Sequence, residues 1–226
     1  MDVIIVAAGL GTRLGRERPK ALVEVGGRPL LAWSVDVFGA HSATRRVILL
    51  APPDHVAEVM AAVPPTDCDV AVVPGGESRA ASVALGLAEV DVDAEIVAVH
   101  DAARPLVSPG IIDAVLAGLD GFDGAIAAAP LADTLKRVDP DGAIEETPSR
   151  ASLWRAETPQ IFRRPVLAEA IDDAISAGRL DAATDCASLV EANRGRVTVV
   201  GHGTPNMKVT TESDIPLAEV LLARVR

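Results

Sequence analysis

The sequence predicts an α/β protein with a mostly parallel sheet, helices on both faces of that sheet and one inserted β-hairpin arm. Short apolar runs alternate along the chain with amphipathic segments of helix length, which is typical of parallel strands joined by crossover helices. Polar motifs directly follow several apolar runs, and ligands of open α/β sheets bind at the carboxyl ends of the strands. The 226 residues, 49% of them hydrophobic, can bury a substantial core. We therefore expect a single domain over residues 1–226 with one excursion.

The expected elements follow from these runs. Six apolar runs predict the strands Val3–Ala7, Arg46–Leu50, Val70–Val73, Ile96–Val99, Gly124–Ala128 and Val197–Val200. Seven amphipathic segments predict the helices Leu30–Phe38, His55–Ala62, Arg79–Ala88, Pro109–Leu119, Pro165–Ala177, Asp185–Ala192 and Ser213–Leu222. Several helices have start signals, such as Ser108-Pro109 and Thr184-Asp185.

The segment 132–154 interrupts this alternation. Two extended stretches flank the turn sequence Asp139-Pro140-Asp141-Gly142, which predicts a β-hairpin inserted as an arm. A hairpin with little core beneath it is marginally stable alone, so it packs on something else. We expect a second copy of the chain to be that partner, so that the arm forms a homodimer.

The first apolar run leads directly into a glycine-rich loop with a high density of positive charge. Gly9, Gly11 and Gly15 allow backbone N–H groups to turn toward an anion. Three arginines and a lysine follow within eight residues: Arg13, Arg16, Arg18 and Lys20. The loop therefore predicts a phosphate-binding site.

The surroundings of the loop argue against two common phosphate-binding folds. A P-loop requires Gly-Lys-Ser/Thr, and this triplet does not occur in the chain. A dinucleotide-binding loop opens directly into a helix with an apolar face, whereas Pro19 interrupts the chain before any such face. That fold also places an acidic residue at the end of its second strand, where this chain has Ala51-Pro52-Pro53.

Charge and composition limit the partners and the location. The net charge of −11 argues against a nucleic-acid-binding surface, so the loop cations act locally on a small anion. Cys68 and Cys186 lie far apart without metal-ligand spacing, which favours two reduced thiols in the cytoplasm. The opening apolar run is too short to span a membrane and lacks the basic segment of a secretory signal. We expect a cytoplasmic protein that binds neither nucleic acid nor membranes.

Seven motifs resemble one enzyme family across nearly the whole chain. They are Ala7–Arg13 with Pro19-Lys20, Gly75–Val83, Val99–Pro105, Asp133–Lys136, Thr158–Gln160, Thr184-Asp185 and Asn206–Thr210. Many nucleotidyltransferases share the first motif. The combination of His100–Pro105, Thr158–Gln160 and Lys208–Thr210 is specific to a much smaller group of proteins. The chain is similar to the 2-C-methyl-D-erythritol 4-phosphate cytidylyltransferases of the non-mevalonate isoprenoid pathway, in their single-domain form. The resemblance implies a Rossmann-like nucleotidyltransferase fold.

The resemblance also implies a reaction. The cytidylyl group of CTP is transferred to 2-C-methyl-D-erythritol 4-phosphate, giving 4-diphosphocytidyl-2-C-methyl-D-erythritol and pyrophosphate. The acceptor phosphate is already an anion, so it attacks the α-phosphorus in line without a general base, and cations must stabilise the transition state. The resemblance assigns Arg13 and Lys20 to that stabilisation, and Arg150 and Lys208 to holding the attacking phosphate. The implied cofactor is Mg²⁺, bound mainly through the CTP phosphates.

The resemblance places the CTP site on residues that follow the first, third and fourth predicted strands: Ala7, Ala8, Gly9, Gly11, Gly75, Gly76, Glu77, Ser82, Asp101 and Ala102. Asp101, at a strand tip, suits either Mg²⁺ or a ribose hydroxyl, and it is the expected metal ligand. Arg104 could instead pair with Asp101 structurally. His100 is expected to be a packed histidine, because neither ring nitrogen has a task in this chemistry.

The same resemblance places the acceptor site on Arg104, Thr134, Arg150, Thr158, Thr184 and Lys208. Thr134 and Arg150 belong to the arm, so we expect them to reach the site of the neighbouring chain, while Lys208 acts within its own chain. The sequence departs from the family pattern at Glu77, where Asp is common, and at Cys186, where an acidic residue is common.

Other interpretations stay open at this point. A cytidylyltransferase acting on another polyol phosphate, such as ribitol 5-phosphate, would share the CTP loop and the strand-tip Asp101. A sugar-1-phosphate nucleotidyltransferase is less well supported, because its Pro-Lys-Pro-Met continuation is missing after Lys20. A non-catalytic nucleotide-sensing module would not need both Arg13 and Lys20.

Overall fold

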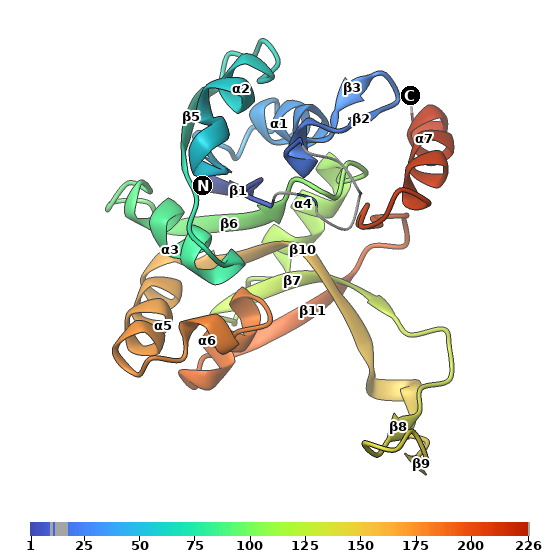
Figure 1. Cartoon of the computed structure of the whole chain (residues 1–226). Helices are drawn as coiled ribbons and strands as arrows, with labels where there is room; N and C mark the ends of the chain where they lie inside the picture. Colours follow the sequence, from blue (N-terminus) through green and yellow to red (C-terminus); the bar gives the residue numbers. More distant parts are fainter. Residues whose placement is uncertain (10, 12–17, 226) are drawn as a thin grey trace.

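The computed structural model describes residues 1–9, 11 and 18–225 (Figure 1). Its centre is a seven-stranded sheet with the strand order β11-β7-β10-β6-β1-β4-β5. The strands are β1 (Asp2–Val6), β4 (Arg46–Ala51), β5 (Asp69–Pro74), β6 (Ile96–Asp101), β7 (Gly124–Pro130), β10 (Trp154–Arg163) and β11 (Val197–Gly201). Adjacent strands are parallel except at β10, which runs antiparallel to both β6 and β7. The mostly parallel sheet predicted from the sequence is confirmed.

Helices cover both faces of the sheet, as the alternation of elements predicted. One face carries α1 (Leu30–Gly39), α2 (Val56–Ala61) and α4 (Pro109–Ala117), and the other carries α3 (Arg79–Ala88), α5 (Arg164–Ser176) and α6 (Cys186–Ala192). Alternate residues of β1 serve the two cores, because successive strand side chains point to opposite faces. Val3 and Ile5 pack in the first core and Ile4 packs in the second. No described helix is both long and apolar enough to cross a membrane.

The predicted helix start signals have a direct structural role. The Ser108 side chain accepts a hydrogen bond from the Ile111 N–H at the start of α4. Asp185 and Ser188 form a reciprocal capping box at the start of α6. Each predicted strand and helix is present, with its ends displaced by at most three residues. The short 3₁₀ turns between them are η2 (Lys20–Leu22), η3 (Pro53–His55), η4 (Arg150–Ser152) and η5 (Leu180–Ala182).

The strand register brings the motif-bearing strand ends together. In the parallel pair of β1 and β6, Val6 lies opposite Asp101. The segment that follows Val6 therefore leaves the sheet beside the Asp101 carboxylate. On the other side of β1, the Gly75 N–H donates to the Ala51 carbonyl at 2.7 Å, so the turn after β5 meets the same edge of the sheet.

Strand β10 is the main element that the sequence did not predict. Its apolar pattern is interrupted by Glu157, Thr158, Pro159 and Gln160, and its register against β7 shifts between Ala156 and Gln160. Three of these interrupting side chains are buried polar groups, and they are satisfied by neighbours that are distant in sequence. Periodicity cannot reveal a strand whose polar groups are compensated only in the folded chain.

A small third core lies beside the sheet and was also missed. The hairpin β2 (Glu24–Val25) and β3 (Arg28–Pro29) turns through Gly26 and Gly27, with φ values of +62° and +74°. Helix α7 (Asp214–Val225) packs against this hairpin and buries Ala218 and Leu222 there. The C-terminal helix thereby covers the segment that follows the glycine-rich loop (Figure 1).

The predicted hairpin arm is present and extends away from the body of the molecule (Figure 1). Its strands are β8 (Arg137–Val138) and β9 (Ile144–Glu146), and Gly142 supplies a φ of +87° in the turn. No residue from 132 to 154 is buried, and Val138 and Ile144 are 52% and 62% exposed. The hairpin itself is confirmed, and its use in dimerisation stays a prediction.

Candidate active site

A cleft of about 340 Å³ lies at the carboxyl ends of β1 and β6. It is lined by Val6, Ala7, Ala8, Gly9, Gly11, Lys20, Ala21, Gly76, Glu77, Ser78, Arg79, Ser82, Asp101, Ala102, Ala103, Lys208 and Thr210. This set contains every predicted nucleotide-binding residue except Gly75, together with the predicted catalytic lysines Lys20 and Lys208. The predicted catalytic residue Arg13 lies outside the described residues.

Gly9 and Gly11 of the glycine-rich loop lie close to Lys20. The Lys20 N–H donates to the Gly9 carbonyl at 3.1 Å, and Lys20 begins the 3₁₀ turn η2. Gly11 has a φ of +70°, and a Cβ on Gly11 would lie 3.0 Å from the Lys20 Cβ. Only glycine combines this backbone conformation with such a close approach. The loop geometry therefore fixes where the Lys20 side chain enters the cleft.

The turn after β5 is equally close to the glycine-rich loop. A Cβ on Gly75 would lie 2.5 Å from the Ala8 Cβ, and one on Gly76 would lie 2.7 Å from the Ala81 Cβ. The Ser82 hydroxyl accepts from the Gly76 N–H at 3.1 Å and donates to the Ser78 carbonyl at 2.9 Å. Gly75 does not line the cleft itself, but its lack of a side chain leaves room for Ala8, which does. Ser82 is buried and holds the turn.

Asp101 is the electrostatic centre of the cleft. Its Oδ1 lies 3.0 Å from Arg79 Nε and its Oδ2 lies 2.8 Å from Lys208 Nζ, and its side chain is only 9% exposed. Burial alone would raise the pKa of Asp101, but Arg79 and Lys208 hold that pKa well below its usual range. The carboxylate therefore stays ionised. The expected alternative pairing of Asp101 with Arg104 is wrong, because Asp101 pairs with Arg79 and Lys208, and Arg104 pairs with Glu157 instead.

Arg79 is the main site residue that the sequence analysis missed. It belongs to the motif Gly75–Val83 and begins a predicted helix, but the sequence assigned it no role in the site. Burial disfavours the charge of its guanidinium, but contacts with Cys186 and Asp101 raise the Arg79 pKa above its ordinary value. A cation in the first turn of a helix opposes the helix dipole, so an arginine there indicates a specific partner. That signal could have directed attention to Arg79.

Thr158 and His100 form a buried link behind Asp101. The Thr158 hydroxyl accepts from the Asp101 N–H at 3.0 Å and lies 3.0 Å from His100 Nδ1. The other His100 nitrogen lies 3.3 Å from the Arg104 carbonyl. Burial lowers the His100 pKa to about 3, so the ring is neutral at physiological pH. The expectation of a packed histidine is confirmed, and the Thr158 hydroxyl supports the strand tip in this arrangement.

The remaining predicted acceptor residues do not line the cleft. Arg104 lies beside it, where its Nη1 donates to the Asn206 carbonyl at 2.7 Å. Thr184 is exposed immediately before the N-cap of α6. The neighbouring Gln160 amide donates to Asp185 Oδ2 at 2.7 Å and its oxygen accepts from the Cys186 N–H at 3.1 Å. Gln160 therefore anchors α6 to β10.

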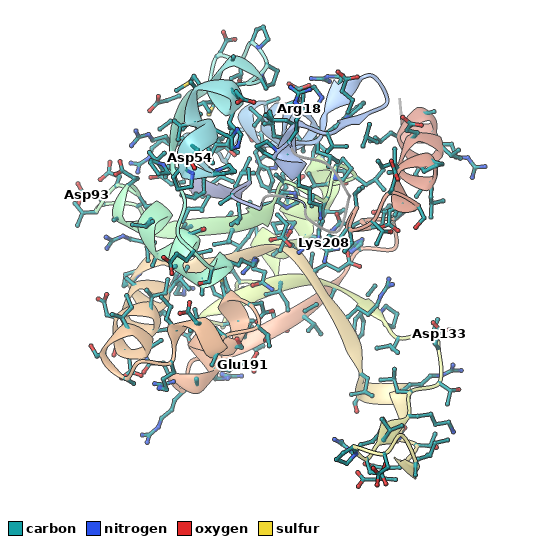
Figure 2. All side chains as sticks on the ribbon, viewed as in Figure 1. Arg18, Asp54, Asp93, Asp133, Glu191 and Lys208 are labelled. Carbon is teal, nitrogen blue, oxygen red and sulfur yellow. The ribbon has the colours of Figure 1, made fainter. Side chains whose placement is uncertain are left out.

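The two arm residues are remote from the cleft of their own chain. Figure 2 labels Asp133 on the arm and Lys208 in the body, well apart from each other. Thr134 is next to Asp133, and Arg150 donates to the Ala132 carbonyl at the root of the arm. Neither residue is among the described residues that line the cleft. Within one chain, the structure does not bring these side chains to the proposed chemistry.

Sequence and structure comparisons agree on one family. The family model described as 2-C-methyl-D-erythritol 4-phosphate cytidylyltransferase matches residues 1–224. The chain belongs to this family. A cytidylyltransferase of that name from Frankia casuarinae is 44% identical over 227 residues, covering 98% of this chain and 80% of the relative. One from Microcystis aeruginosa is 38% identical and covers 99% of both chains.

Solved structures of the cytidylyltransferase family share the whole fold. The 4-diphosphocytidyl-2C-methyl-D-erythritol synthase of Anaerococcus prevotii superposes with a TM-score of 0.86 at 28% identity, covering 99% of this chain and 98% of that one. The 2-C-methyl-D-erythritol 4-phosphate cytidylyltransferase of Thermus thermophilus gives a TM-score of 0.79 at 34% identity with the same coverage. The predicted nucleotidyltransferase fold is therefore confirmed.

Replacement of Gly75 tests the close approach behind the cleft wall. In Gly75→Ala, the new Cβ displaces Ala8, so we expect CTP affinity to fall on the order of tenfold by calorimetric titration. Gly110→Ala is the matched control, because a Cβ at Gly110 meets open space in α4. Equal CTP affinity in both variants would show that the Gly75–Ala8 approach is not needed for nucleotide binding.

The buried neutral His100 predicts a pH dependence of stability. Between its ordinary pKa of 6.5 and the lowered value of about 3, the unfolded chain binds a proton at this residue and the folded chain does not. Stability therefore falls as the pH decreases through this window, by up to about 1.4 kcal/mol per pH unit. We expect His100→Gln to flatten that slope in urea unfolding in metal-free buffer between pH 6 and pH 4. An unchanged slope in a cooperatively folded variant would contradict the assignment.

Proposed function

We propose that the chain transfers the cytidylyl group of CTP to 2-C-methyl-D-erythritol 4-phosphate, giving 4-diphosphocytidyl-2-C-methyl-D-erythritol and pyrophosphate. One observation carries the proposal. The glycine-rich loop, the Gly75-Gly76 turn and two lysines converge on one cleft in a chain that matches the family model over nearly its whole length. The cleft has the size of a small-molecule site.

The reaction is a direct displacement at phosphorus. An oxygen of the acceptor phosphate forms a bond to the α-phosphorus of CTP as the bond to the pyrophosphate oxygen breaks. The nucleophile is an anion, so no proton has to be removed from it. The task of the protein is to align the reactants and stabilise the negative charge. Lys20 and Lys208, which both line the cleft, supply the stabilising positive charge together with Arg13.

The nucleotide lies along the loop and the turn after β5 in this proposal. The triphosphate contacts the backbone of residues 7–9 and 11, and the cytosine lies beside Gly76 and Glu77. Backbone N–H and carbonyl groups at this turn form hydrogen bonds with the edge of the cytosine. The limited space beside the turn excludes purines, which are larger. Arg79 keeps Asp101 in position beside Ala102, where the ribose or a metal ion would be bound.

A Mg²⁺ ion fits this cleft if the bound nucleotide supplies most of its ligands. The described residues contain no cluster of three metal-ligating side chains, so they do not by themselves enclose an ion. Asp101 can contribute one carboxylate, and phosphate oxygens and waters would complete the shell, as Mg²⁺ commonly prefers. When bound, the ion would neutralise charge on the triphosphate. Arg79 and Lys208 already occupy one position on each Asp101 oxygen, which leaves each oxygen with one further position for an ion.

The acceptor site is completed by a second copy of the chain in this proposal. Arg104, Thr158, Thr184 and Lys208 belong to the body, while Thr134 and Arg150 come from the arm of the partner. Two observations support a homodimer: the arm has no buried residue of its own, and it exposes the apolar Val138 and Ile144. The free thiols of both cysteines support a cytoplasmic location.

The choice of acceptor is tested by pyrophosphate release from CTP. We expect rapid release with 2-C-methyl-D-erythritol 4-phosphate and release lower by at least about two orders of magnitude with ribitol 5-phosphate, because hydroxyl partners placed for one polyol leave polar groups unpaired with another. Faster release with ribitol 5-phosphate would instead assign the chain to that acceptor. No release with either acceptor would favour a nucleotide-sensing role.

Lys20 is expected to act in the transition state. Lys20→Ala removes a cation from the developing charge, so kcat should fall on the order of 10²–10³-fold while the unfolding midpoint stays near that of the wild type. Arg46→Ala is the control, since Arg46 pairs with Asp69 at the amino ends of the strands, away from the cleft. Near-normal turnover in the Lys20 variant would remove it from the mechanism.

A mixed-dimer experiment tests whether the arm acts on the partner. Arg150→Ala and Lys20→Ala chains should each be nearly inactive alone. In a heterodimer with arms acting in trans, one site carries both changes and the other is intact, so activity should rise toward one working site per dimer. Mass spectrometry of differently tagged chains verifies that heterodimers form. Heterodimers without activity would mean that Arg150 acts within its own chain.

A further inference from the structure

A buried carboxylate and a buried histidine form a pair at the root of the arm. His202 Nε2 lies 3.1 Å from Glu157 Oε2, and the two side chains are 4% and 6% exposed. Glu157 belongs to β10, and His202 directly follows β11. Neither residue was predicted from the sequence, and neither has a part in the reaction described above. A buried polar pair adds little net stability compared with apolar side chains of the same volume, so its presence calls for another explanation.

Two arginines flank this pair. Arg104 Nη1 lies 3.9 Å from Glu157 Oε2, and Arg155 Nη2 lies 3.6 Å from Glu157 Oε1. The Arg104 side chain is only 11% exposed, and burial lowers its pKa while the charges of Asp101 and Glu157 act in the opposite direction. Within the described part of the chain, Glu157 is the one carboxylate that lies within 4.0 Å of the Arg104 guanidinium. Asp101 and Glu157 therefore both favour the charge of the buried Arg104 guanidinium, and Glu157 is the one that pairs with it directly.

Arg104 in turn holds the segment that carries Lys208. Its Nη1 donates to the Asn206 carbonyl at 2.7 Å, and the Asn206 amide donates to the Thr158 carbonyl at 2.8 Å. The Val209 N–H donates to the Ala103 carbonyl at 2.8 Å. Between these attachments lies Lys208, whose ammonium reaches into the cleft to Asp101. A displacement of Arg104 would therefore be passed to Lys208 through a short stretch of backbone.

We propose that the Glu157–His202 pair is a positioning device for the acceptor phosphate: it orients Arg104 and, through Asn206, Lys208. The inference rests on the proposed function, because it assumes that these two cations bind the acceptor phosphate. His202 holds the Glu157 carboxylate in place, and the Glu157 charge, 3.9 Å away, attracts the Arg104 guanidinium. The pair touches neither the loop nor the turn that would bind CTP, and its relay meets the cleft only at Lys208 and Asp101, so we expect its main effect on the acceptor.

The first test is Glu157→Gln, which keeps the shape and removes the charge. We expect the KM for 2-C-methyl-D-erythritol 4-phosphate to rise on the order of tenfold, while the KM for CTP stays within about twofold of wild type. The matched control is Asp2→Asn. Asp2 is a fully buried carboxylate that pairs with Arg45 at 3.0 Å at the start of β1, at the opposite end of that strand from the cleft. This control should lower the unfolding midpoint and leave both KM values unchanged.

A second pair of variants keeps the test decisive if Glu157→Gln folds poorly. His202→Leu removes the donor to Glu157, and His202→Gln retains an amide donor of similar reach. We expect the acceptor KM to rise in the leucine variant and to return toward wild type in the glutamine variant. Equal changes in the KM values for both substrates, or no difference between the His202 variants, would overturn the inference. Failure of the wild type to turn over this acceptor would instead overturn the proposed function.

Discussion

The rest of the site depends on the Asp101 carboxylate, which is held between Arg79 and Lys208. The three side chains come from the end of β6, the start of α3 and the segment before α7, so this ion cluster joins three separate parts of the chain. Asp101 neutralises one of the two cations and fixes the direction of both. Because its pKa is held low, the cluster is not disrupted by protonation at physiological pH. The cleft thereby keeps an excess of positive charge in a defined geometry.

The positive cleft is notable in a chain with a net charge of −11. A local cluster of cations in a concave site attracts an anionic nucleotide, while the acidic remainder of the surface disfavours nonspecific binding to nucleic acid. The burial of several of these charges requires compensating groups close by. Asp101 serves this purpose at the nucleotide side, and Glu157 with His202 serves it beside Arg104. The acidic residues of the site therefore maintain the positions of its cations.

The sequence predicted most of the fold, and each miss has a physical cause. Alternating apolar runs identified six of the seven sheet strands, because those strands are buried by apolar side chains. Strand β10 was missed because Glu157, Thr158 and Gln160 are buried polar groups whose partners lie elsewhere in the chain. The glycine motifs located the cleft, because positions where two backbone segments approach closely require glycine. Arg79 was overlooked because a helix position alone does not identify a partner on another strand.

The sequence by itself determined the α/β class, the hairpin arm and the family to which the chain belongs, because these features depend on local periodicity, turn residues and short motifs. The tertiary structure decided which charges meet. Lys208 and Asp101 are 107 positions apart, and their contact follows from strand register and from the return of the chain before α7. It likewise decided that Arg79 rather than Arg104 pairs with Asp101, and that Glu157 pairs with His202. Such pairings arise from the packing of distant segments, and no local pattern in the sequence encodes them.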